Sequence, residues 1–140
     1  VCKDRTSELD GAWYVTITAA DLDNGSTDNC GAVTFTASQT VFDCADLGGN
    51  TITLTGTDDT GNSDDCTSSV TIIDSITPTL ICNVDLQSCD SVFTYTVTAN
   101  DNFYGFVINK SAGLPSGSVF PLGVTINPFE VIYAIGNRDT

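Results

Sequence analysis

The sequence predicts an all-β fold made of two small β-sandwiches in tandem, and three observations support this. Apolar and polar residues alternate in several short segments, turns rich in Gly, Asn and Asp separate these segments, and the whole pattern occurs twice. An alternation with a period of two gives a strand one packed face and one wet face. Strands that recur every ~8–15 residues with turn residues between them are typical of a β-sandwich.

Five segments carry the alternation most clearly, and we expect each to form a strand. They are residues 13–18, 33–36, 51–55, 70–72 and 93–98, in which Thr often alternates with Val, Ile or an aromatic residue. No stretch sustains the 3.6-residue period of an amphipathic helix. Only residues 18–22 are expected to form a single helical turn.

The chain repeats itself at an offset of ~75–80 residues, which is the length of one small sandwich. Residues 28–31 resemble 101–105, residues 40–43 resemble 118–121, and Gly61-Asn62 resembles Gly136-Asn137. Pro78 ends strand pairing and stiffens a short linker at 73–78. The expected domains are therefore residues 1–75 and 76–140, and we expect the second repeat to lack its last strand.

Charge and composition exclude several classes of function. Eighteen acidic residues against four basic ones give a net charge of -14, which repels nucleic acids and anionic membranes but suits divalent cations. The sequence holds no His, so a His general base and a His-ligated zinc site are excluded. No apolar run approaches the ~18–20 residues that cross a bilayer, and no signal peptide is visible.

We expect no enzymatic activity. The Asp residues lie among Gly, Ser and Thr in predicted loops, where no apolar pocket would raise a carboxyl pKa for acid–base catalysis. The only Glu residues are Glu8 and Glu130, and no Ser lies in a Gly-x-Ser-x-Gly elbow.

The six cysteines indicate a disulfide framework. Their number is even, none form the paired Cys-x-x-Cys spacing of a zinc or redox site, and the chain is small and rich in turns. Such a framework is typical of an oxidising compartment outside the cytosol.

Several motifs together resemble the hyalin-repeat family of immunoglobulin-like domains. They are Asp28-Asn29-Cys30, the run from Thr57 to Asn62, Val-Thr-Ile-Ile-Asp at 70–74 and Pro-Thr-Leu-Ile-Cys at 78–82. Residues 17–30 are similar to one subgroup, the long repetitive surface proteins of Bacteroidota that include SprB-type gliding adhesins. The second repeat departs from the family pattern, because Phe103 stands where the family has a cysteine.

Comparison of the two repeats suggests a disulfide pairing. The second repeat keeps Cys82 at the place of Cys2, lacks a counterpart of Cys44 and gains Cys89. The simplest pairing is then Cys2–Cys44 and Cys82–Cys89. Cys30 is left for Cys66, and the immunoglobulin-like fold that the resemblance implies brings their loops to one end of the domain.

Two acidic loops are candidate calcium ligands. If the implied fold is right, they converge at one end of the first domain, where carboxylate and carbonyl oxygens suit Ca²⁺. The alternative is a solvated acidic surface in which Asp residues cap turns. The candidate ligands are Asp21, Asp23 and Asp28 from one loop and Asp58 and Asp59 from the other, which also holds Asp64 and Asp65.

Aromatic residues and short triplets supply two further candidates. The aromatic side chains could stack on sugars or pack in the core. Alternation predicts that one of Trp13 and Tyr14 is buried. The other aromatic candidates are Tyr95, Phe103, Tyr104 and Phe106. Ser75 and Ser91 lie in Asp-Ser-aliphatic triplets that resemble the O-glycosylation motif of exported Bacteroidota proteins. The N-glycosylation sequons at Asn24 and Asn109 are expected to be silent in a bacterial source.

The resemblance implies a structural stalk repeat of a secreted cell-surface adhesin that extends an adhesive tip, with a role in gliding motility as one possibility. Its expected partners are neighbouring repeats, surface polysaccharide and the secretion or gliding machinery, and its location is the outside of the outer membrane after type nine secretion. The alternative is a carbohydrate-binding accessory module of a secreted enzyme.

Overall fold

The computed structural model describes residues 1–29, 31–84, 92–102, 105–133 and 138–140. The chain divides into two compact units, Val1–Ser75 and Ile76–Thr140, which we call unit 1 and unit 2. In the described residues both units are built of strands, and the helical elements are two short 3₁₀ turns in unit 1, so the predicted all-β class is confirmed. Within the described ranges no helix is long and apolar enough to cross a membrane.

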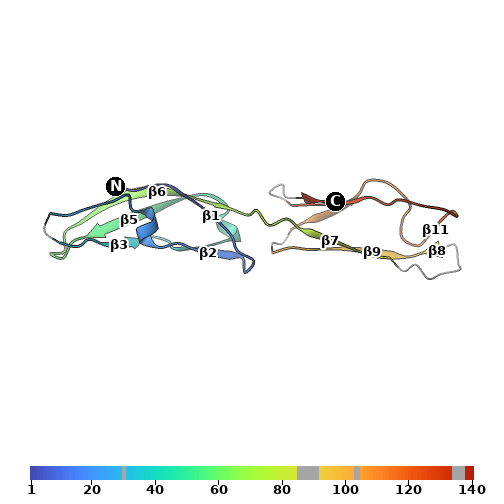
Figure 1. Ribbon diagram of the computed structural model, residues 1–140, viewed down its shortest axis with the longest axis horizontal. Helices are drawn as coiled ribbons and strands as arrows, with labels where there is room; N and C mark the ends of the chain where they lie inside the picture. Colours follow the sequence, from blue (N-terminus) through green and yellow to red (C-terminus); the bar gives the residue numbers. More distant parts are fainter. Residues whose placement is uncertain (30, 85–91, 103–104, 134–137) are drawn as a thin grey trace. The chain divides into compact units, whose positions relative to one another are not determined.

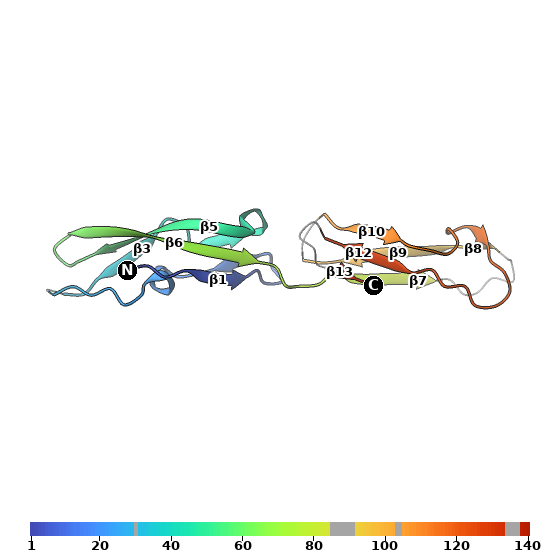
Figure 2. The same cartoon turned by 90° about the horizontal axis from the view of Figure 1, so that it is seen from above.

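Unit 1 contains a four-stranded sheet and a two-stranded sheet (Figures 1 and 2). The larger sheet has the order β1 (Arg5–Glu8), β6 (Ser63–Ile73), β5 (Gly48–Thr57) and β3 (Thr34–Ala37). Strand β1 runs parallel to β6, and the other neighbours are antiparallel. The smaller sheet pairs β2 (Tyr14–Thr16) with β4 (Val41–Asp43).

The core of unit 1 follows from the alternation in its strands. Along β5 and β6 every second residue points inward, which buries Ile52, Leu54, Val70 and Ile72. Phe42 from β4 in the other sheet is fully buried against them. The cluster is completed by Leu9, Ile17 and Leu22.

Two short 3₁₀ turns connect the strands of unit 1. The first, η1 (Ala19–Leu22), confirms the predicted helical turn, and the Thr18 side chain caps it while Leu22 packs into the core. The second, η2 (Cys44–Asp46), is capped in the same way by Asp43.

The described residues of unit 2 form three small sheets. They are β7 (Thr79–Val84) with β9 (Tyr95–Asn100), β8 (Val92–Phe93) with β11 (Ser118–Val119), and β10 (Val107–Lys110) with β12 (Phe129–Ile132) and β13 (Arg138–Asp139). Its first strand, β7, pairs antiparallel with β9, whereas the first strand of unit 1 pairs with the last strand of that unit.

Three strands keep the same register in both units. In unit 1, Thr57 of β5 lies opposite Thr34 on one side and Ser63 on the other. In unit 2, Ile132 of β12 lies opposite Val107 and Arg138. Ile132 and Arg138 each lie 75 residues after their counterparts in unit 1, so the internal repeat seen in the sequence is also a repeat of strand pairing.

Unit 2 buries fewer large side chains than unit 1. Among its described residues the buried hydrophobic side chains are Val131 and Tyr133. Aromatic rings in edge-to-face contact supplement them: Phe93 with Phe120, Tyr95 with Phe129, and Phe106 with Tyr133.

Candidate functional site: the acidic loops and cysteines of unit 1

A groove of about 710 Å³ lies where the loops of unit 1 meet the end of its large sheet. The acidic residues that line it are Asp28, Asp58, Asp64 and Asp65. Apolar side chains also line it, namely Val33, Phe35 and Leu54. The acidic wall was predicted, but the apolar lining was not, because it depends on which strand residues end beside the loops.

A close approach joins the two acidic loops. A Cβ atom added to Gly31 would lie 2.7 Å from Oδ2 of Asp59, which is closer than real Cβ contacts. The first loop therefore comes within contact distance of the second through a residue without a side chain. Asp59 itself is exposed beside Gly31.

The carboxylate of Asp58 accepts hydrogen bonds from residues of its own turn. Its Oδ1 accepts hydrogen bonds from the backbone N–H groups of Thr60 and Asn62 at 2.8 and 2.9 Å, and its Oδ2 accepts from the Asn62 amide at 2.8 Å. These bonds, the one from the Asn62 side chain first, lower the pKa of Asp58 to about 2. The carboxylate is thus charged at neutral pH and holds the turn between β5 and β6 closed.

Asp23 forms a similar turn in the first loop. Its carboxylate accepts hydrogen bonds from the Ser26 hydroxyl at 2.5 Å and from the backbone N–H groups of Gly25 and Ser26. The Ser26 hydroxyl is the main cause of a lowered pKa for Asp23. Gly25 adopts a φ of +83°, a backbone conformation that residues with a side chain rarely adopt.

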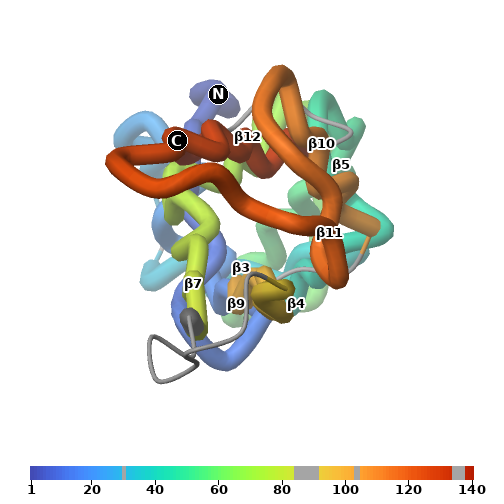
Figure 3. Tube along the Cα trace, turned by 90° about the vertical axis from the view of Figure 1, so that its right-hand side faces the viewer, coloured from blue at the N-terminus to red at the C-terminus, as the bar shows by residue number. Residues whose placement is uncertain are grey.

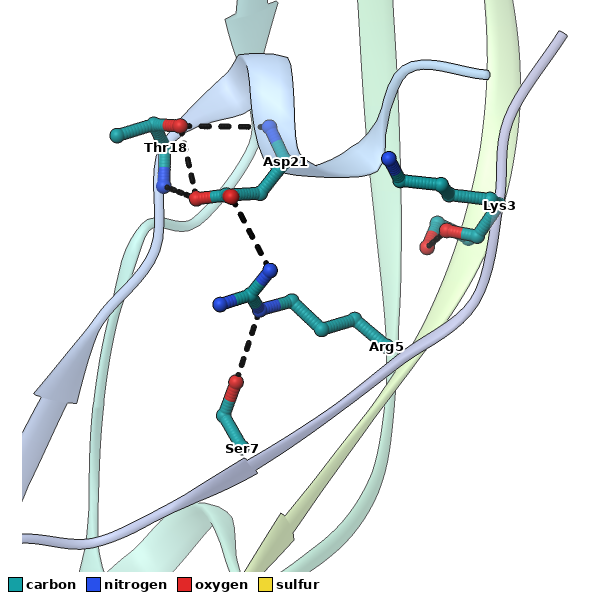
Figure 4. A network of polar contacts seen from close by, with 6 residues as sticks. Lys3, Arg5, Ser7, Thr18 and Asp21 are labelled. Atoms are coloured by element: carbon teal, nitrogen blue, oxygen red, sulfur yellow. Dashed lines mark hydrogen bonds and ion pairs between the residues drawn. The ribbon is translucent and has the colours of Figure 1, made fainter.

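Asp21 belongs to a polar network away from the groove (Figure 4). Its Oδ2 accepts from the backbone N–H and the hydroxyl of Thr18, both at 2.8 Å, and its Oδ1 pairs with the Arg5 guanidinium at 3.1 Å. The bonds from Thr18 are the main reason why the pKa of Asp21 is lowered. Arg5 also donates to Ser7, so the network ties η1 to β1.

The candidate calcium ligands are therefore only partly brought together. Asp28 and Asp58 line the same groove, Asp59 lies beside it at Gly31, and Asp21 and Asp23 serve turns of their own. Over the part of the chain that the structure describes, no three His, Cys, Asp or Glu side chains are grouped as a metal site. Calcium binding stays a prediction.

The disulfide pairing in unit 1 differs from the prediction. Cys2 is bonded to Cys66, with Cα atoms 5.8 Å apart. The predicted pairs Cys2–Cys44 and Cys30–Cys66 are therefore wrong. The cause is the parallel pairing of β1 with β6, which carries the first residues of the chain along β6: the Ser68 hydroxyl donates to the Lys3 carbonyl at 2.7 Å, and the Ser69 N–H donates to Asp4.

Two described cysteines, Cys44 and Cys82, are free thiols, although the prediction placed both in disulfides. Cys44 is half-buried, and burial, followed by the negative charges of Asp43 and Asp74, raises the pKa of its thiol. Cys82 is exposed on β7 and free, so the predicted bond from Cys82 is absent. Its expected partner Cys89 lies outside the described residues, as does Cys30.

The aromatic residues at the start of β2 are both exposed, against the prediction that one would be buried. Trp13 is 40% exposed and Tyr14 48%. The alternation fails because Trp13 has a φ of +78°, which takes it out of the extended backbone of the strand. Tyr95 and Phe106 take part in ring packing inside unit 2, while Phe103 and Tyr104 lie outside the described residues.

The candidate glycosylation sites are accessible where the structure describes them. Ser75 is exposed at the end of unit 1, and Asn24 and Asn109 are exposed in their sequons. Ser91 lies outside the described residues.

Comparisons with known proteins leave the chain without an assigned family: no family model matches it, and no curated protein matches it.

Proposed function

We propose that the chain is a structural repeat segment from the stalk of an exported cell-surface adhesin, with each unit an immunoglobulin-like β-sandwich of the hyalin-repeat type. The motifs at 28–30, 57–62 and 70–82 support the family. The shared register of three strands in the two units supports a tandem repeat, in which each unit has its own interior.

The observation that carries the proposal is the position of the disulfide in unit 1. It joins residue 2 to residue 66 of a unit that ends at residue 75. Tension applied at the two ends of unit 1 therefore passes from Cys2 through the disulfide to Cys66. The chain between these residues is protected from stretching, which is what a stalk needs when an adhesive tip is pulled.

Single-molecule force spectroscopy tests this use of the disulfide. When the oxidised chain is pulled by handles at both ends, one long unfolding step should lengthen it by roughly 200 Å, and this step comes from the unfolding of unit 2. A thiol reductant or the Cys66→Ser substitution should add a second release of similar length, because the disulfide spans 64 residues at up to ~3.6 Å each. Two long releases from the oxidised chain would contradict the proposal.

A carbohydrate-binding module is the second candidate, and the exposed pair Trp13 and Tyr14 favours it. Adjacent exposed aromatic rings offer flat apolar faces on which sugar rings stack. A glycan array separates the two functions. Binding that is lost in Trp13→Ala and Tyr14→Ala, but kept in the matched variant Val41→Ala on the neighbouring strand, would replace the stalk proposal.

The proposed location is the cell surface, outside an outer membrane. The disulfide is typical of an oxidising compartment, and the net charge of -14 suits a hydrated surface rather than an anionic membrane. Under this proposal the partners are neighbouring repeats, surface polysaccharide and the secretion or gliding machinery, and exposed Ser75 is the candidate site for O-linked sugar. Intact mass of protein from the native host tests the modification.

A further inference from the structure

The turn that leads from β1 into β2 holds Trp13 in an unusual backbone conformation. The N–H of Asp10 donates to the carbonyl of Tyr14 at 3.3 Å, and the N–H of Trp13 donates to the carbonyl of Asp10 at 3.0 Å. Among the described residues, Trp13 is the one residue other than glycine with a positive φ, +78°. This left-handed region is costly for a bulky residue, and turns that need it usually place Gly or Asn there.

The glycine of this turn is at a different position. Gly11 does not have a positive φ, and a Cβ added to it would meet nothing within 4 Å, so a residue with a side chain would fit there. Trp13 occupies the position that suits glycine, yet its side chain is 40% exposed and is not part of the core of unit 1. Backbone strain at an exposed aromatic residue is typical of a functional position.

The outer face of the small sheet continues from this turn (β2 in Figure 1, β4 in Figure 3). Alternation along the two strands turns Val15 and Phe42 inward and leaves Tyr14 and Asp43 exposed. Tyr14 lies directly opposite Asp43 in the antiparallel register, where Cβ atoms are about 4.5–5.5 Å apart. A second aromatic ring and a carboxylate are therefore neighbours on this face, beside Trp13.

The charges near this face are negative. The sulfur of Cys44 lies 3.9 Å from the carbonyl oxygen of Trp13, and the pKa of this thiol is raised by burial and then by the charges of Asp43 and Asp74. Asp43 also caps η2, and its Oδ1 accepts from the Ala45 N–H at 2.7 Å. A carboxylate has about four acceptor sites, so the capping bonds leave room for a ligand.

The basic residues of unit 1 are not placed to neutralise this face. They are Lys3, which precedes β1, and Arg5, which begins it, whereas the turn follows the end of β1. Arg5 is paired with Asp21 and donates to Ser7. The ligand that complements two aromatic rings and a carboxylate here is therefore a cation.

We propose that Trp13, Tyr14 and Asp43 bind an arginine side chain of a separate basic polypeptide. The planar guanidinium stacks on aromatic rings and pairs with a carboxylate through its fork of N–H donors, so one group matches both kinds of side chain. A neutral sugar would stack on the rings but would gain nothing from the negative charge. The site would bind arginine whether or not the chain is a stalk repeat.

Fluorescence of Trp13 provides the test, because it is the single tryptophan of the chain. A short peptide with two arginines between glycines is added to the full chain at low ionic strength. We expect a saturable change in Trp13 emission, and added salt should weaken the binding because it screens exposed charges. The same peptide with neutral citrulline in place of arginine should bind about fivefold more weakly or less.

Variants with the same loss of charge locate the contact. Asp43→Asn should weaken binding of the arginine peptide about two- to fivefold, and asparagine can still cap η2. Asp64→Asn, at an exposed residue of the acidic groove, is the matched control and should leave the binding unchanged. Tyr14→Leu keeps an apolar side chain without the ring and should weaken binding by a similar factor to Asp43→Asn.

Two variants of Trp13 test the backbone argument. Trp13→Gly and Trp13→Ala both remove the ring and should weaken binding about fivefold in titration calorimetry. Glycine alone relieves the left-handed φ, so unit 1 should melt about 4–8 °C higher in Trp13→Gly than in Trp13→Ala. At an ordinary extended position the order would be reversed, because glycine loses more conformational entropy on folding.

Four results would overturn the proposal. One is no change in Trp13 emission with millimolar arginine peptide, and another is equal binding of the citrulline peptide. A third is a saturable response to neutral oligosaccharides of glucose or N-acetylglucosamine that Tyr14→Leu removes, since the face would then be a sugar platform. The fourth is a Trp13→Gly variant that melts no higher than Trp13→Ala, which would remove the backbone strain on which the proposal rests.

Discussion

The two units share the register of three strands but differ in how much of the central strand is covered. In unit 1 the ten residues of β5 lie under β6, and a disulfide fastens the start of the chain to β6. Among the described residues of unit 2, β12 pairs with β13 at Val131 and Ile132. The described residues of the two units thus share one strand arrangement but differ in the contacts that hold it.

The difference teaches where the stability of such a repeat originates. Strand β6 supplies Val70 and Ile72 to the core of unit 1, and both are fully buried. Each fully buried side chain of this kind contributes about 1.5–3 kcal/mol. Unit 2 buries Val131 and Tyr133 among its described residues and otherwise depends on aromatic edge contacts, so we expect it to be the less stable unit.

Equivalent phenylalanines sharpen this comparison and give the largest expected effect. Phe42 is fully buried, whereas Phe120, which follows Val119 as Phe42 follows Val41, is only partly buried against Phe93. Phe42→Ala should destabilise unit 1 by about 3–5 kcal/mol. Phe120→Ala should cost unit 2 less than half as much in urea unfolding, and equal losses would contradict the difference in packing.

Removal of the disulfide should come next. Cys66→Ser should lower the stability of unit 1 by about 2–4 kcal/mol, because the unfolded chain regains the entropy of a long open loop. Cys44→Ser is the matched control and should change stability by less than about 1 kcal/mol, since Cys44 is a free thiol. The reverse order of effects would restore the pairing of Cys2 with Cys44.

Acid should lower the free energy of unfolding of unit 1 by protonating Asp58. Unit 2 lacks this carboxylate, because the buried Tyr133 stands at the equivalent position. The pKa of Asp58 is lowered from 3.8 to about 2 on folding, so its contribution to stability is present above pH 4 and is lost as the pH falls towards 2. Asp58→Asn should flatten the pH dependence of the unit 1 melting temperature in this window. Asp59→Asn, next to it and exposed, should leave that dependence intact.

Calcium gives the smallest expected effect. Extracellular modules that bind Ca²⁺ do so at ~10⁻⁴–10⁻³ M, so if unit 1 binds Ca²⁺ with such an affinity, millimolar Ca²⁺ should raise its melting temperature by a few degrees at most. Asp28→Asn should remove that rise, because Asp28 lines the groove. An unchanged melting temperature at millimolar Ca²⁺ would leave these carboxylates as turn-forming groups on a solvated surface.

The strands were predictable because alternation is a local property. Segment 33–36 lies one residue from β3, segments 51–55 and 70–72 lie inside the longer strands β5 and β6, and the helical turn at 18–22 is present. The partner of each strand is not a local property. The parallel pairing of β1 with β6 carries Cys2 to Cys66, and no spacing of cysteines along the chain encodes that contact.

The sequence predicted which acidic residues lie in the candidate site, but not which hydrogen bonds their carboxylates make. The acidic loops do meet at one groove, yet Asp21, Asp23 and Asp58 hold turns through nearby Thr, Ser and Asn side chains. The exposure of both Trp13 and Tyr14 depends on a single backbone angle at Trp13. Such an angle interrupts alternation without changing the sequence pattern.

Calorimetry with and without a thiol reductant tests most directly the claim that unit 1, which a disulfide fastens, is the more stable unit. Fluorescence of Trp13, the single tryptophan of the chain, assigns the unit 1 transition. We predict two transitions in the oxidised chain, with unit 1 melting at the higher temperature. Reduction should lower that transition by about 10 °C or more and leave the other unchanged. A unit 1 transition at the lower temperature, or one that reduction does not move, would contradict the account.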